Sequence, residues 1–224
     1  MSNLFNIALG IHIFFGGIAL VIAPLAMVTV KGGLWHRRWG KIYFWSMAGI
    51  ALSATLLCWL RSGLFLFLIA IFSFYLALTG YRVLRRKQPE TKAQALDWCA
   101  AIAMVLAGIG LLVLGAFGEN GSPRWVRMIF GTIGLLLGVI DIGIFLRPTL
   151  KKRAWFYAHM TRFLSAYVAT VTAFSVVNFQ FLPYFWRWLW PTILGTAGIT
   201  IWRRYYARKF AATAAPVPAM ATKQ

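Results

Sequence analysis

The sequence predicts an all-α polytopic integral membrane protein, a seven-transmembrane-helix bundle with its N-terminus outside and its C-terminus inside. Two features of the composition support this: 61% of the 224 residues are hydrophobic and only 12% are charged, against roughly a quarter charged in globular domains. A third is that apolar stretches of about 20 residues, the length that crosses a bilayer, recur along the chain. A soluble domain of this size could not bury so much apolar surface.

Seven stretches qualify as spans, and lipid requires each to be a helix because its backbone groups must pair internally. The first carries Pro24, where we expect a kink, and the last is the weakest because Arg187 and Pro191 interrupt its start. Together they form one transmembrane domain, 1–205, followed by a short Ala- and Pro-rich tail, 206–224, that we expect to be disordered and cytoplasmic. The predicted spans are 4–30, 42–60, 63–81, 97–117, 126–146, 155–178 and 186–202.

The orientation follows from the basic residues, which give a formal net charge of +19. Of the 23 Lys and Arg residues, 18 fall in alternate connections and the C-terminal segment, and four fall on the opposite side. This asymmetry is the positive-inside signal of a bacterial inner (cytoplasmic) membrane protein. We expect the basic loops to contact anionic lipid headgroups, and we expect no nucleic acid partner because no nucleic-acid-binding module is recognisable.

A stripe of small residues in the fifth span predicts a helix-packing seam. Gly131, Gly134 and Gly138 lie at offsets that place them on one helical face, and Asp141 continues the same face. Small residues let two helices approach closely in a membrane. We therefore expect an internal seam that ends in a carboxylate near the cytoplasmic side.

Five polar residues fall at similar depth on the predicted cytoplasmic side: His36, Asp97, Asp141, His159 and Arg162. In a structural interpretation, Asp141 pairs with Arg162, Asp97 caps its helix and His36 is a solvated loop residue. In a functional interpretation, the cluster binds a small ligand or ion, because intramembrane ionisable groups often mark such sites.

The cofactor question stays open between a divalent metal and haem b. His36, His159 and Asp141 could bind a metal such as zinc, although no close-spaced metal motif is present. Haem b would take His36 and His159 as axial ligands, provided that the second span begins early, near residue 36. His12 lies in the outer leaflet, where we expect a hydrogen bond to Thr170, Thr172 or Ser175.

Two strings resemble a known family: HIFFGGIALVIAPLAMVTVKGGLWHRRWGKIYFWSM, with His12, Lys31, His36 and Tyr43, and WFYAHMTRFLSAYVATVTAFSVVN, with His159 and Arg162. The chain resembles the domain-of-unknown-function 2306 type of predicted bacterial membrane proteins over residues 10 to about 205. The resemblance implies a multi-pass inner-membrane protein. It implies no substrate, cofactor or catalytic role.

The leading functional hypothesis is a multi-pass inner-membrane protein that binds or translocates a small ligand or ion through the His/Asp cluster. The alternatives are a metal-dependent membrane enzyme or a haem b redox protein that uses the same histidines. A further alternative is an accessory or assembly subunit of a membrane complex, or a homo-oligomer, with the glycine seam available to a partner helix.

Overall fold

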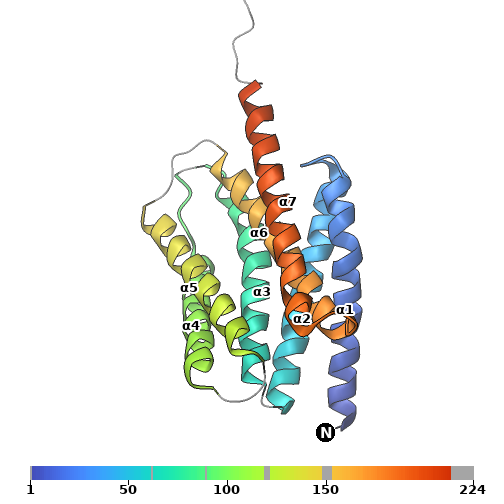
Figure 1. The fold of residues 1–224 in the computed structure, drawn as a ribbon. Coiled ribbons are helices and arrows are strands. Elements are labelled where there is room, and N and C mark those ends of the chain that lie inside the picture. The colour runs from blue at the N-terminus through green and yellow to red at the C-terminus, as the bar shows by residue number, and fades with distance from the viewer. Residues whose placement is uncertain (1, 62, 89, 119–121, 148–152, 213–224) are drawn as a thin grey trace, which may run out of the picture.

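The computed structural model describes residues 2–61, 63–88, 90–118, 122–147 and 153–212 (Figure 1). Within these ranges the chain forms α-helices, one short 3₁₀ helix and no strand. The elements are α1 (Ser2–Val28), α2 (Leu34–Arg61), α3 (Leu64–Arg82), η1 (Val83–Arg85), α4 (Ala95–Phe117), α5 (Arg124–Leu146), α6 (Ala154–Asn178) and α7 (Tyr184–Ala212). The expectation of an all-helical bundle is confirmed for these residues.

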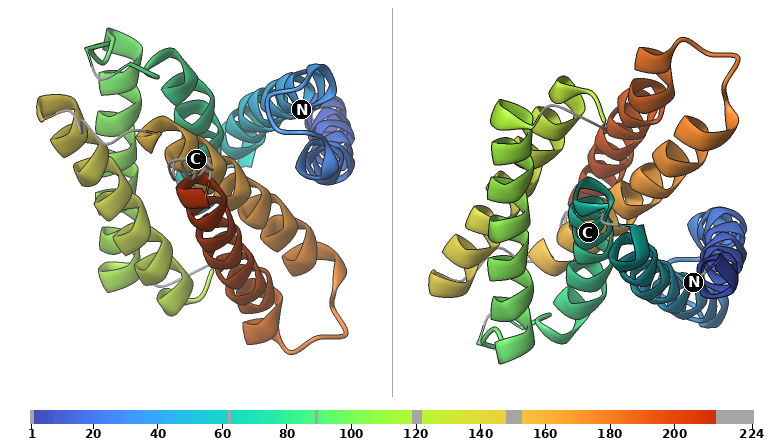
Figure 2. Two further views of the ribbon diagram at one scale, coloured as in Figure 1. Left: turned by 90° about the horizontal axis from the view of Figure 1, so that it is seen from above. Right: turned by 90° about the horizontal axis from the view of Figure 1, so that it is seen from below.

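The helices run alternately up and down, so that the N-terminus and the end of α7 lie at opposite ends of the bundle (Figure 1). Viewed along the bundle, the pairs α1 with α2, α4 with α5 and α6 with α7 are arranged around α3 (Figure 2). Helix α3 is central, because it packs against α2, α4, α5 and α6. We call the end that carries Lys31, Arg37, Arg85 and Lys87 the basic end.

Six helices, α1 to α6, are long and apolar enough to cross a membrane. Their outward faces carry large apolar side chains, such as Ile13, Leu52 and Leu106, with 63%, 75% and 63% of their surface exposed. In water such exposure would be costly, whereas lipid tails accept it. The core instead gathers around α3, where Phe72 and Tyr75 pack with Met47 of α2 and Met104 of α4.

The glycine seam of α5 packs against α4. Gly131, Gly134 and Gly138 are buried there, and a methyl group added at Gly131 would lie 2.9 Å from the backbone nitrogen of Leu112. On the facing helix, a methyl group at Gly108 would lie 2.6 Å from the backbone nitrogen of Leu135. Because α4 occupies this face, the seam is internal, as expected, and the idea that it receives a partner helix is wrong.

Pro24 lies inside α1, as expected from the sequence. A proline has no N–H, so the carbonyl four residues earlier, at Leu20, loses its helical donor. The hydroxyl of Tyr167 on α6 donates to this carbonyl at 3.4 Å. The proline therefore creates an acceptor that ties α1 to α6.

Two predicted boundaries are wrong. Helix α2 begins at Leu34 and not at residue 42, and α7 continues to Ala212 and not to residue 202. In both cases the helix extends through a polar, basic segment that apolarity alone assigns to a loop or tail. Residues 206–212 are therefore helical, and the rest of the predicted tail, 213–224, lies outside the described residues.

Candidate functional site

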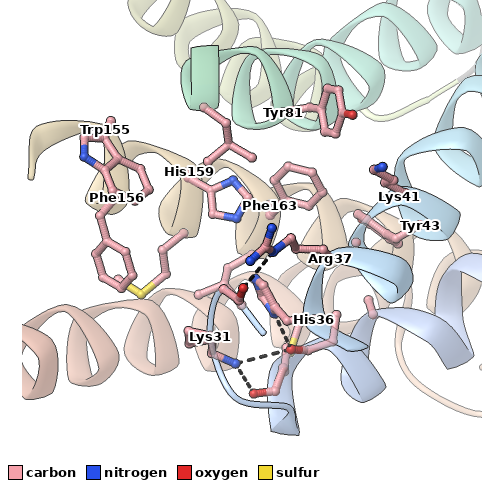
Figure 3. Close-up of a pocket in the computed structure, with 18 of the residues that line it drawn as sticks. Lys31, His36, Arg37, Lys41, Tyr43, Tyr81, Trp155, Phe156, His159 and Phe163 are labelled. Carbon is pink, nitrogen blue, oxygen red and sulfur yellow. Dashed lines mark hydrogen bonds between the residues drawn. The ribbon is translucent and has the colours of Figure 1, made fainter. Parts of the chain in front are cut away.

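A cavity of about 520 Å³ opens between α1, α2, α3, α6 and α7 at the basic end (Figure 3). Its wall combines seven aromatic side chains, two histidines and five cations, and no carboxylate is found among its described lining residues. The aromatic residues are Tyr43, Tyr81, Trp155, Phe156, Phe163, Trp202 and Tyr206; the cations are Lys31, Arg37, Lys41, Arg85 and Lys87.

His36 and His159 face each other across this cavity from α2 and α6 (Figure 3). Their ring centroids are 6.2 Å apart and their planes are inclined by 77°. His36 is within α2 because that helix starts at Leu34, so the expectation of a solvated loop residue is corrected.

Each of these histidines is oriented by a carbonyl at the C-terminal end of another helix. His36 Nδ1 donates to Ala26 O in the last turn of α1, at 2.9 Å. His159 Nδ1 donates to Gly80 O in the last turn of α3, at 2.8 Å. Such carbonyls lack helical partners, and a carbonyl can only accept. Both rings therefore carry a hydrogen on Nδ1.

The second nitrogen of each ring, Nε2, is consequently the group presented to the cavity. Within the described residues, neither Nε2 of His36 nor Nε2 of His159 has a hydrogen-bond partner. Fixing Nδ1 through a carbonyl is how proteins orient a histidine whose other nitrogen binds a ligand or a metal.

Three of the five cations of the cavity are held by backbone oxygens or aromatic rings. Lys31 Nζ donates to Met27 O and, at 3.3 Å, to Ala26 O at the end of α1, and it lies 5.2 Å from the ring centre of Trp202. Arg37 Nε donates to Gly32 O at 2.7 Å, and Lys87 lies over Trp155. Burial lowers the pKa of Lys31, because partial dehydration disfavours its charged form.

Asp97 is not part of this cavity. Its carboxylate accepts two hydrogen bonds from Arg82 of α3, from Nε at 2.7 Å and from Nη2 at 2.9 Å. It also accepts the backbone N–H of Gln94 at 2.9 Å, which caps the start of α4 as expected. Asp97 therefore joins the end of α3 to the start of α4.

Asp141 is also separate from the cavity. Arg162 Nη2 of α6 donates to Asp141 Oδ1 at 2.6 Å, and the hydroxyl of Tyr75 on α3 donates to Asp141 Oδ2. The expected pairing of Asp141 with Arg162 is confirmed. Both side chains are nearly buried, with 11% and 12% of their surface exposed.

The predicted polar cluster is thus divided into three parts: the histidine pair, the Asp97–Arg82 pair and the Asp141–Arg162 pair. The metal set of His36, His159 and Asp141 is not assembled, because Arg162 and Tyr75 engage the carboxylate. Across the part of the chain that the structure describes, no three His, Cys, Asp or Glu side chains come together as metal ligands.

His12 is distant from this end and has a different partner from those expected. Its Nδ1 lies 3.1 Å from Ser53 Oγ of α2. The expected acceptors on α6 are engaged elsewhere: Ser175 Oγ accepts from Trp190 Nε1 at 2.8 Å, and the hydroxyl of Thr172 donates to Val168 O. Helix α1 packs mainly on α2, which explains the change of partner.

Two residues of these sites carry no distinguishing signal in the sequence: Tyr75 and Arg82. Tyr75 gives no signal, because an aromatic residue within a span resembles any other core residue. In the sequence Arg82 is one basic residue among many beside a predicted loop, although its side chain joins the end of α3 to the start of α4. Comparisons of the chain with protein-family models, curated proteins and solved structures find no match.

Proposed function

We propose that the chain is a membrane protein that binds an anionic amphipathic small molecule in the cavity at its basic end. The observation that carries the proposal is the wall of that cavity: five cations and two histidines, with no carboxylate among the described lining residues. Positive side chains that converge without acidic partners favour an anionic ligand. The volume of about 520 Å³ suits a small molecule.

The aromatic side chains that line the cavity indicate the shape of the uncharged part of the ligand. Trp155 and Phe156 of α6 and Trp202 and Tyr206 of α7 offer flat apolar surfaces. Aromatic side chains pack against planar groups and contribute a large buried area. The ligand expected is therefore a flat or apolar molecule that carries its negative charge at one edge.

The same proposal includes a topology of seven spans in a bacterial inner membrane, with the N-terminus outside and the basic end at the cytoplasmic face. Helix α7 is less apolar than the other six, but it runs antiparallel to α6 and projects from the same end of the bundle at which α1 and α2 are connected (Figure 1). Reporter fusions at Ser2 and Gln224 test this arrangement. A cytoplasmic signal at Gln224 and a periplasmic signal at Ser2 are expected, whereas reporters on the same side would contradict seven spans.

Ligand binding can be measured with two naphthalene dyes that differ in charge. Anilinonaphthalene sulfonate carries a negative charge, and phenylnaphthylamine has the same rings without it. Energy transfer from the tryptophans of the chain, of which Trp155 and Trp202 line the cavity, reports binding to the protein in lipid nanodiscs. We expect the sulfonate to bind saturably and about tenfold more tightly than the neutral dye, a difference of about 1.4 kcal/mol.

The charge requirement is tested by the double variant Lys31→Gln/Arg85→Gln, which removes two cations of the wall. We expect this variant to bind the sulfonate about tenfold more weakly and the neutral dye unchanged. Lys92→Gln is the matched control, because Lys92 is exposed at the same end but does not line the cavity. Equal affinities for both dyes, or equal losses in the variant and the control, would overturn the proposal.

A further inference from the structure

We infer that the ligand of this cavity is haem b, held by His36 and His159 as the two axial ligands of its iron. The inference rests on the proposed function and names its ligand. Axial ligation by His36 requires that the second helix begin near residue 36. Helix α2 starts at Leu34, so His36 lies on this helix and lines the cavity.

The geometry of the two rings fits a shared iron atom. Two iron–nitrogen bonds of about 2 Å, plus about 1 Å from each nitrogen to its ring centre, place two axial imidazoles about 6 Å apart. The centroids of His36 and His159 are 6.2 Å apart. Both axial ring planes contain the nitrogen–iron–nitrogen axis, so their inclination is free, and the observed 77° is permitted.

The protonation pattern of the rings also fits. Iron binds the unprotonated nitrogen of an imidazole, and the hydrogen bonds to Ala26 O and Gly80 O place the hydrogens of both rings on Nδ1. Each Nε2 is then left with its lone pair. These carbonyls also fix the ring orientations from two other helices, as the supporting residues of metal-bound histidines do.

The number of protein ligands separates haem from a bare metal ion. Zinc sites use at least three protein ligands, and within the described residues no group of three exists. A porphyrin supplies four nitrogens of its own, so two histidines complete six-coordinate iron. The site therefore has the donors that haem requires and lacks those that zinc requires.

The remainder of the wall matches the remainder of the cofactor. The aromatic side chains of α6 and α7 suit the faces of a porphyrin, and the cations suit its two propionates. Lys31 lies beside Trp202, and Lys87 lies beside Trp155, so positive charge adjoins aromatic surface at two places in the cavity. A planar molecule with two carboxylates, such as haem, uses both features together.

The first experiment is to purify the full chain from cells supplied with a haem precursor and to record its absorption spectrum. We expect a Soret band, the sharp visible bands of low-spin six-coordinate haem after reduction with dithionite, and about one haem per chain by pyridine haemochrome. A colourless protein that also takes up no added haemin would overturn the inference.

The chain supplies its own matched control, since it has three histidines. His36→Gly and His159→Gly should each abolish the low-spin spectrum, whereas His12→Gly should retain it, because His12 lies outside the cavity. Added imidazole should restore the six-coordinate spectrum of the two cavity variants, which shows that they remain folded. Retention of the low-spin spectrum in either cavity variant without imidazole would contradict the assignment.

Binding of the anionic dye and binding of haemin distinguish a failure of the haem inference from a failure of the proposed function. If the anionic dye binds but haemin does not, the cavity takes an anion and haem is the wrong one. If neither binds, the proposed function fails as well. If haemin displaces the dye and Lys31→Gln/Arg85→Gln weakens both, the two proposals are supported together.

Discussion

The carboxylate of Asp141 on α5 and the guanidinium of Arg162 on α6 meet at 2.6 Å inside the bundle, with Tyr75 of α3 bonded to the same carboxylate. Three helices are therefore joined by polar side chains that are nearly buried. Breaking a buried pair by removing one charge costs more than removing both, because a single unpaired charge remains.

Asp141→Asn leaves Arg162 without its counter-charge, and we expect it to destabilise the protein by about 3–5 kcal/mol. Adding Arg162→Leu removes the unpaired charge and should restore most of the loss. Thermal unfolding followed by circular dichroism in one detergent measures all four members of the cycle. Effects that simply add would show that the two side chains are not coupled.

Arg82→Lys tests the bidentate ion pair that Arg82 of α3 forms with Asp97 of α4. An ammonium cannot supply the parallel hydrogen bonds that Arg82 Nε and Nη2 give to Asp97, so we expect a loss of about 2 kcal/mol. Arg124→Lys makes the same chemical change at an exposed position and should leave the unfolding temperature unchanged. A similar fall in unfolding temperature in both variants would show that the paired hydrogen bonds of Arg82 to Asp97 add no stability of their own.

Gly108→Ala tests the close approach of α4 and α5. The new methyl group would lie 2.6 Å from the backbone of Leu135, which cannot rotate away, and we expect a loss of about 1–3 kcal/mol. Gly143→Ala is the control, because nothing lies within 4 Å of the added methyl. There the higher helix propensity of alanine should give up to about 1 kcal/mol of added stability. Comparable unfolding temperatures for the two variants would refute this packing.

The affinity for an anion should depend on pH through Lys31. Burial lowers its pKa from the ordinary value of 10.5, so Lys31 loses its charge at a pH where exposed lysines remain charged. Affinity for anilinonaphthalene sulfonate should be full below this lowered pKa and should fall as pH rises through it. Lys31→Arg keeps the charge, and the fall should move to higher pH. An unchanged pH profile would exclude Lys31 as a partner of the anion.

The sequence predicts the helices well because lipid imposes their length and forbids unpaired backbone. It misplaces the start of α2 because the first two turns of this helix are basic, and apolarity alone assigns such a segment to a loop. The start of α2 at Leu34 is therefore visible only in the backbone of the folded chain.

The sequence predicts at which end of the bundle each candidate site residue lies, but not toward which neighbouring helix its side chain points. Alternating spans place His36, His159 and Asp141 at one end, yet they do not say which face of each helix points where. Asp141 points toward α3 and α6, where Tyr75 and Arg162 engage it, while His159 points to the cavity. Only the packing of α3 at the centre of the bundle decides between these directions.

The order of synthesis has a consequence for the histidine pair. A nascent chain that has inserted α1 to α5 already carries Lys31 and His36, and Ala26 can already receive the hydrogen bond of His36. It has neither His159 nor the aromatic wall of α6 and α7. The complete cavity, with His159 opposite His36, therefore forms only after α6 and α7 have joined the bundle.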